Sequence, residues 1–444
     1  MLLVRVLGLS LALALFGGLN YYLYRRLVHD VTGSTRLRRL GAGVIIALSA
    51  LMPLTRLLSV STPLTRLVAL VVLCWWGLIL FTLMGLAAVE VVRGVLRLTR
   101  RHPASEVTTA TVRKPPSEPS ALASLVATLD SGGPAVALDG EGATLSARLD
   151  RAEEGDRVGS MELETPQVSR RRFIARATAA GALAFGGGLS AFGARSAFSA
   201  PLVTELALRL PGLPKALEGF TIVQLSDLHI GLIIQEPFVD RLVAMANALH
   251  PDLVAITGDL VDGIPRELRP IVERLTGLRS RHGTYFVSGT HDYYSGWERW
   301  APEVERLGIT VLRNRFVPIG DAAASFDLVG VDDWGSQFAH NGYDLEKATA
   351  GRDPHRPSVL LAHQPSGLEL AAAKHIGLQL SGHTHGGQLF PGTLVGEAIW
   401  GERNAGLSTH DGTLLYTNRG CGFVGPPMRV GAPPEVAKLV LLPA

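Results

Sequence analysis

The chain has 444 residues and a formal net charge of +3; 47% of its residues are hydrophobic and only 18% are charged. A soluble protein of this size usually carries more charge, so the composition predicts that part of the chain lies in lipid. No long run of Lys and Arg accompanies the small positive charge, which argues against nucleic acid as a partner. The two cysteines, Cys74 and Cys421, are far apart in the sequence, and we expect no disulfide framework.

Residues 1–100 are predicted to form a transmembrane region of about three helices, from apolar runs at 7–23, 40–54 and 67–89. The middle run is shorter than the roughly 20 residues that cross hydrocarbon, so an interfacial or re-entrant helix is the alternative there. Arginines gather in the first loop and again after the third run. Because positive loops stay inside, this pattern places the N-terminus outside and residue 95 onward in the cytoplasm.

Two segments of different composition follow. Residues 101–168 are rich in Pro, Ser, Ala, Asp and Glu without a sustained period, which predicts a disordered cytoplasmic linker. Residues 169–200 begin with Arg170, Arg171, Arg172 and Phe173 and continue as a weakly apolar, Gly/Ala-rich stretch, which resembles a twin-arginine signal. The alternative is a basic flank before a fourth span. Either interpretation predicts a multi-pass protein of the cell membrane with everything after residue 200 on the extracytoplasmic side.

Residues 205–444 have an α/β pattern. A helical spacing of apolar residues, from Val239 to Leu249, separates the first two β-rich runs. Strands are predicted at 220–225, 253–257, 284–288, 327–331, 358–362, 378–381, 414–417 and 438–442. Alternation of strands with helices predicts sheets covered by helices.

Five short polar clusters follow the ends of predicted strands, where α/β sheets expose functional groups. They occupy residues 226–229, 257–262, 288–292, 362–365 and 381–388. In Asp227-x-His229 and His383-x-His385, the paired side chains point to the same side if the backbone stays extended. Imidazole together with carboxylate suits Mn, Fe or Zn, and two such ions about 3.5–4 Å apart form a clamp for displacement at phosphorus. Asp259 is the candidate for a carboxylate shared between them.

The order of these clusters, D-x-H, G-D, G-x-H-D, H and G-H-x-H from Asp227 to His385, resembles the calcineurin-like metallophosphoesterase family. The run 381–388 and the run 418–427 are most similar to a membrane-linked bacterial branch. The resemblance covers about residues 205–444. It implies two mixed β-sheets packed face to face with flanking helices.

The resemblance also implies roles for individual residues. Asp227, His229 and His385 would bind the first of two divalent ions (Mn, Fe or Zn), Asp259 would bridge, and His363 and His383 would bind the second. His291 would protonate the leaving oxygen or stabilise the charged transition state, after a metal-bridging hydroxide attacks phosphorus. The implied activity is hydrolysis of phosphomonoesters or phosphodiesters at the outer face of the membrane. Tethering suggests a lipid-linked or wall-linked phosphoester as substrate.

One position departs from the family pattern, which has Asn where this chain has Thr290. A neutral hydroxyl is a weaker metal ligand than an amide carbonyl, so Thr290 predicts a looser second site. There are two alternative functions: a catalytically weak metal-binding module, and a membrane scaffold that works through the linker. Asp262 is interpreted as a turn-stabilising carboxylate, with a tuning role as the alternative. The aromatic residues at 293–300 either line a cleft or pack in the core.

Overall fold

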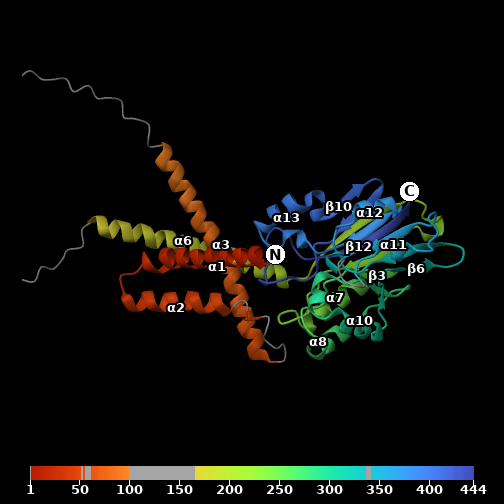
Figure 1. Cartoon of the computed structure of the whole chain (residues 1–444), viewed down its shortest axis with the longest axis horizontal. Helices are drawn as coiled ribbons and strands as arrows, with labels where there is room; N and C mark the ends of the chain where they lie inside the picture. Colours follow the sequence, from red (N-terminus) through yellow and green to blue (C-terminus); the bar gives the residue numbers. More distant parts are fainter. Residues whose placement is uncertain (1, 52–53, 56–61, 100–165, 337–341) are drawn as a thin grey trace, which may run out of the picture. The chain divides into compact units, whose positions relative to one another are not determined.

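The computed structural model describes residues 2–51, 54–55, 62–99, 166–336 and 342–444 (Figure 1). The chain divides into two compact units, one made of residues 1–89 and 175–444 and the other of residues 90–174. Residues 101–165 of the predicted linker lie outside the described residues. The predicted domain boundaries therefore stay predictions.

The N-terminal region is helical. Its helices are α1 Leu2–Tyr24, which runs into a π-helical turn Arg25–His29, α2 Thr35–Leu51, α3 Pro63–Thr99 and α6 Pro166–Phe198. Among the described residues, two helical segments are long and apolar enough to cross a membrane, Pro63–Thr99 and Arg170–Phe198. Helix α2 has 17 residues, fewer than the roughly 20 of a typical span. Helices consistent with a transmembrane region are thus present, while the number of spans stays a prediction.

The first of two six-stranded sheets has the order β1-β12-β2-β3-β4-β5. Strands β2 to β5 run parallel, whereas β12 is antiparallel to β2 and parallel to β1. Their bounds are β1 Leu202–Leu210, β2 Phe220–Leu225, β3 Leu253–Ile256, β4 Thr284–Phe286, β5 Thr310–Val311 and β12 Glu435–Pro443.

The second sheet has the order β10-β11-β9-β8-β7-β6 and is also mixed. Strands β11, β9, β8 and β7 are parallel, with an antiparallel edge strand on each side. Their bounds are β6 Arg315–Gly320, β7 Ser325–Gly330, β8 Ser358–Leu361, β9 Leu378–Ser381, β10 Gly406–His410 and β11 Thr413–Thr417.

The two sheets pack face to face, as predicted, because their strands alternate side chains between two buried faces. Ile222 and Ala255 of the first sheet share a core with Leu361 and Leu380 of the second. The neighbouring residue Val223 points the other way, into a core with helices. The helices on that outer face are α7 Glu236–Ala248, α8 Pro265–Val272 and α10 Trp297–Arg306, and those on the second sheet include α11 Leu345–Thr349 and α12 Leu368–Ala373 (Figure 1).

Two side chains of the aromatic run belong to the core. Trp297 and Trp300 are buried under the first sheet, with exposed fractions of 2% and 1%. The packing interpretation therefore holds for both tryptophans. Tyr294 is 80% exposed, and its ring lies 5.8 Å from that of His291, so this tyrosine remains beside the polar clusters.

Candidate metal centre

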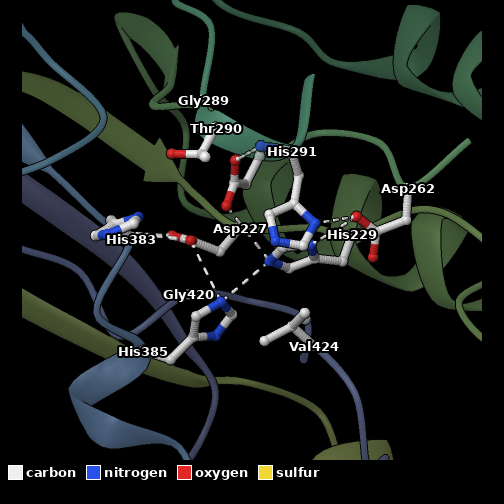
Figure 2. Close-up of polar contacts among 12 residues, drawn as sticks. Asp227, His229, Asp262, Gly289, Thr290, His291, His383, His385, Gly420 and Val424 are labelled. Carbon is white, nitrogen blue, oxygen red and sulfur yellow. Dashed lines mark hydrogen bonds and ion pairs between the residues drawn. The ribbon is translucent and has the colours of Figure 1, made fainter. Parts of the chain in front are cut away.

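Polar residues from both sheets meet at the carboxyl ends of the central strands (Figure 2). They follow β2 (Asp227, His229), β3 (Asp259), β8 (His363) and β9 (His383, His385), and His291 lies in the short helix α9 Thr290–Tyr294. These seven residues form overlapping groups in which each residue's candidate ligand atom lies within 4.8 Å of the others in its group. The structure brings together every aspartate and histidine predicted for the site.

The backbone at these positions is not extended. Asp227, His229, His383 and His385 have φ values of 53°, 50°, 72° and 52°, and Asp259 has 50°. Left-handed backbone is uncommon for residues other than glycine. The expectation that extended backbone aligns residues i and i+2 is therefore wrong. Repeated left-handed residues make tight loops after the strands. These loops bring Asp227 and His229 into one group of candidate ligands and place His383 and His385 in two neighbouring groups.

Glycines allow these loops to approach one another closely. Gly258 has a φ of 92°, and a Cβ built on it would lie 2.6 Å from Nδ1 of His363. A Cβ on Gly289 would collide with the backbone nitrogen and carboxylate of Asp259. A side chain at either position would displace a predicted ligand.

The first donor group consists of Asp227, His229 and His385. The Nε2 atoms of His229 and His385 are 3.0 Å apart, and His385 Nε2 lies 3.4 Å from Oδ1 of Asp227. All three residues are buried. Two ring nitrogens and a carboxylate that converge in a buried space are a suitable set of ligands for a divalent cation.

The second donor group consists of Asp259, His363 and His383. His363 Nε2 lies 3.2 Å from Oδ2 of Asp259 and 3.3 Å from Nδ1 of His383. The same Asp259 oxygen lies 3.7 Å from Nε2 of His229 in the first group. Asp259 thus stands between the two groups, where the sequence predicts a shared carboxylate.

Hydrogen bonds select the tautomers of two histidines. Nδ1 of His363 lies 2.8 Å from the carbonyl oxygen of Thr257, and Nδ1 of His229 lies 3.2 Å from Oδ1 of Asp262. Both partners are acceptors, so each Nδ1 is the donor. When these rings are neutral, their Nε2 lone pairs face the other candidate ligands, as in histidines that bind metal ions.

The charges of the centre shift its pKa values in both directions. Burial opposes protonation of His229, yet the surrounding carboxylates, led by Asp262, raise its pKa to about 9. Burial together with the charge of His363 lowers the pKa of His383 to about 4. Burial and the charge of Arg429 lower the pKa of His385 well below its usual value. A lowered pKa favours the neutral ring, which is the form of imidazole that binds metal ions.

Comparison with known proteins shows the family of the chain. A family model described as calcineurin-like phosphoesterase matches residues 220–387. A metallophosphoesterase of Aquifex aeolicus, named as uncharacterized, is 32% identical over 240 residues, which cover 53% of this chain and 89% of that protein. The chain belongs to the calcineurin-like metallophosphoesterase family.

A further relative and a solved structure are also similar to part of this chain. A Bos taurus "Transmembrane protein with metallophosphoesterase domain" is 39% identical over 266 residues, which cover 57% of this chain and 60% of that protein. This chain therefore spans less than two thirds of the length of that relative. A solved structure of TT1561 from Thermus thermophilus is 13% identical, with a TM-score of 0.32, and covers 46% of this chain and 89% of that one.

Thr290, where the family pattern has Asn, is hydrogen-bonded within the protein. Its Oγ1 donates to Oδ2 of Asp333 at 3.0 Å and accepts from Nε2 of Gln364 at 3.2 Å. Gln364 also donates to Oδ1 of Asp333 at 3.1 Å. The hydroxyl thus joins a buried carboxylate to an amide, a network that the sequence did not predict.

Asp262 contacts two histidines of the site, in addition to the turn-stabilising role that the sequence predicted for it. Its Oδ1 lies 3.2 Å from Nδ1 of His229 and 2.6 Å from Nδ1 of His291, so one carboxylate oxygen orients two rings (Figure 2). Burial raises the pKa of Asp262, but the charges and hydrogen bonds of the two histidines hold it well below its usual value. Its position three residues after Asp259 is the sequence signal for this role.

The sequence predicted no role for Arg429, which contacts a candidate metal ligand. Its side chain is 1% exposed, and its Nη2 donates to Nδ1 of His385 at 2.9 Å. Its remaining N–H groups donate to the backbone carbonyls of His385, Arg419, Gly420, Gly422 and Ala432. The only available signal is its place shortly after the motif that ends at Pro427.

Proposed function

We propose that the chain is a metal-dependent hydrolase of phosphomonoesters or phosphodiesters. The observation that carries this proposal is the pair of donor groups, Asp227/His229/His385 and Asp259/His363/His383, with Asp259 between them. These residues would hold two divalent ions, Mn, Fe or Zn, which supply a nucleophile from water and neutralise charge at phosphorus. Thr290 would add at most a hydroxyl to the second ion.

His291 would act on the substrate. Its backbone N–H donates to Oδ1 of Asp259 at 2.7 Å, and its Nδ1 is held by Asp262, so the ring is fixed beside the donor groups with Nε2 free of both bonds. In its charged form the ring would donate from Nε2 to the leaving oxygen. The same contact would neutralise negative charge on the phosphoryl group.

We further propose that this activity takes place at the extracytoplasmic face of the cell membrane. The two apolar helical segments and the printed name of the cattle relative support a membrane location. The loop arginines and the basic segment at 170–172 support the orientation. A phosphoester carried by a lipid or by a wall polymer is the substrate class that fits this place.

The test uses the full chain in lipid nanodiscs, with bound metal counted by elemental analysis and hydrolysis measured on soluble aryl phosphomonoesters and phosphodiesters. We expect His383→Ala and His385→Ala each to abolish hydrolysis and to lower the metal content, because each removes a ligand from a different donor group. His375→Ala, at an exposed histidine outside the site, is the matched control. Full metal content without turnover in the unmodified chain would favour the metal-binding module instead, and full activity in either variant would reject the assignment.

A further inference from the structure

Helix α13, Gly392–Trp400, turns its apolar side outward. The α13 apolar face consists of Leu394, Val395, Ala398 and Ile399, all exposed. The three large side chains have exposed fractions of 55%, 56% and 68%, in the order of the sequence. These four residues fall on one side of a helix because they are spaced by one and four positions. An apolar stripe of this kind on a water-exposed surface marks a site of interaction.

The opposite side of the helix is fixed against the protein. A Cβ on Gly396 would lie 2.6 Å from a side-chain atom of Asn404, so the backbone packs closely there. The ring of Trp400 stands edge-on to that of His383 at a centroid distance of 5.9 Å. Rotation of α13 to bury its apolar face would therefore break its contacts with the metal centre. The folded structure therefore keeps the α13 apolar face exposed.

The segment that leads into α13 contacts the membrane helices. Leu389 packs against a cluster formed by Phe81 of α3 and by Met428 and Val430. The next residue, Phe390, donates its N–H to the carbonyl of Val430 at 2.9 Å. Between Met428 and Val430, the N–H of Arg429 bonds to the carbonyl of Gly193 in α6 at 2.9 Å. The segment before α13 thus packs against α3 and α6, the helices that, among the described residues, are apolar enough to cross a membrane.

We infer that α13 lies in the membrane interface, with its apolar face among lipid acyl chains. An amphipathic helix parallel to the bilayer binds in this way. Glu397 is the helix's one charged residue, so we expect zwitterionic lipid to suffice. The contact of Trp400 with His383 would then hold the metal centre at the level of the lipid head groups. This inference rests on the proposed function in one respect, because it specifies a phosphoester carried by a membrane lipid as the substrate.

The first test is independent of activity. The full chain with Cys74→Ala retains only the fully buried Cys421, and it receives a single nitroxide label at Ile399→Cys in phosphatidylcholine nanodiscs. We expect the label to collide with oxygen several-fold more, relative to a water-soluble nickel chelate, than a label at Leu370→Cys. Leu370 on α12 is the matched control, since it is 49% exposed and lies outside α13. The inference would be overturned if the label at 399 were as accessible to the nickel chelate as the label at 370. It would also be overturned if the labels of two copies of the chain were in contact.

The second test uses hydrolysis. Ile399→Asp should slow cleavage of a lipid-carried phosphodiester in the same bilayer about tenfold, roughly the affinity contributed by one buried aliphatic side chain. Its rate on a soluble aryl phosphodiester should stay near that of Leu370→Asp. Equal losses on both substrates would contradict the lipid-specific role. If the unmodified chain cleaves neither substrate while the label at 399 lies in lipid, the proposed function fails and the docking of α13 stands.

Discussion

Backbone strain is concentrated at the residues that converge on the metal centre. Each non-glycine residue held in the left-handed region costs about 1 kcal/mol or more, and the surrounding structure has to hold it there. Backbone hydrogen bonds from Asp227 to Gly258 and from His229 to Asp259 do so for the first loop. The carboxylate of Asp227 also accepts the N–H of His383 at 3.1 Å, which ties the loop of one sheet to that of the other. The candidate metal ligands are thus fixed in position by hydrogen bonds within and between their loops.

Thr290 offers a test of how the second donor group is completed. Thr290→Asn places an amide where the family pattern has one, and the amide oxygen is a better ligand than a hydroxyl. We expect the metal concentration at half-maximal activity to fall about tenfold, equivalent to about 1.4 kcal/mol. The measurement is a titration of activity and of bound metal with Mn for both proteins.

The contacts of Thr290 define the opposite outcome. If the hydroxyl serves mainly to hold Asp333 and Gln364, the asparagine would break that network and leave the metal midpoint unchanged. Gln364→Ala is the control, because it removes the amide from the network and leaves residue 290 as it is. An unchanged midpoint in Thr290→Asn would reject the idea of an under-coordinated second site.

Metal binding should release protons. The pKa of His229 is raised to about 9 and that of His363 is also raised well above its usual value, by carboxylates that outweigh burial. Both rings have to lose a proton to bind a cation, so affinity should rise with pH up to about 9, the pKa of His229, and the contribution of His229 should level off above it. His383, with a pKa of about 4, should contribute no proton in this range. Calorimetry in buffers of different ionisation enthalpy counts the protons, and a pH-independent affinity would contradict this assignment.

At the scale of single elements, the sequence predicted interior strands and missed edge strands. The eight predicted strands correspond to β2, β3, β4, β7, β8, β9, β11 and β12. The four that were missed, β1, β5, β6 and β10, are the edges of the two sheets in the described part of the chain. Interior strands are buried on both faces and appear as apolar runs, whereas edge strands alternate with polar residues or contain proline, as β6 does at Pro318.

For the site, too, the sequence predicted some of the residues and missed others. Aspartates and histidines at strand ends are a strong signal, because few structural roles explain them together. Arg429 gave no such signal, since its role depends on a contact with His385 that only the folded chain creates. The hydrogen bond between Thr290 and Asp333 likewise exists only in the folded chain. Helix α13 was missed because its apolar residues carry a helical pattern without a core to face.

The segment from Asn418 to Gly431 is held together by Arg429. Arg429→Lys keeps the charge but cannot donate to all the carbonyls that surround the guanidinium. Leaving buried acceptors without donors should lower the free energy of unfolding by about 1–3 kcal/mol. Arg429 donates to Nδ1 of His385, so Nε2 of the neutral ring carries the proton that a bound cation would replace. Loss of the contact leaves the ring without its orienting partner, which should weaken metal binding about tenfold. Thermal unfolding and metal retention after dialysis measure the two effects.

Arg299→Lys is the control for this substitution, because Arg299 is exposed on α10. An Arg429→Lys protein that is destabilised but keeps both metal ions would show that the arginine supports the fold without positioning His385. Retention of both stability and metal would show that the carbonyls find other donors.

For the whole molecule, the contacts of Met428 and Val430 with α3 and α6 link the metal centre to the helices of the proposed membrane region. Met428 packs on Phe81, and a Cβ on Gly193 would lie 2.8 Å from a methyl group of Val430. Both residues flank Arg429, which contacts His385. Neighbouring residues of one short segment thus contact the membrane helices and a predicted metal ligand. The site and the proposed membrane region are linked through packing as well as along the chain.

The orientation of the chain is the last prediction. The loop arginines predict a cytoplasmic linker, and the basic segment before the apolar part of α6 predicts that the catalytic domain lies outside. A cysteine at Ala322, exposed in the turn between β6 and β7, should react with a membrane-impermeant maleimide in intact cells. A cysteine at Ser117, in the predicted linker, should react only after the cells are permeabilised. Both variants carry Cys74→Ala, and the parent protein without an added cysteine gives the background. Reaction at 117 in intact cells, or protection at 322, would reverse the orientation and place the proposed hydrolysis on the cytoplasmic side.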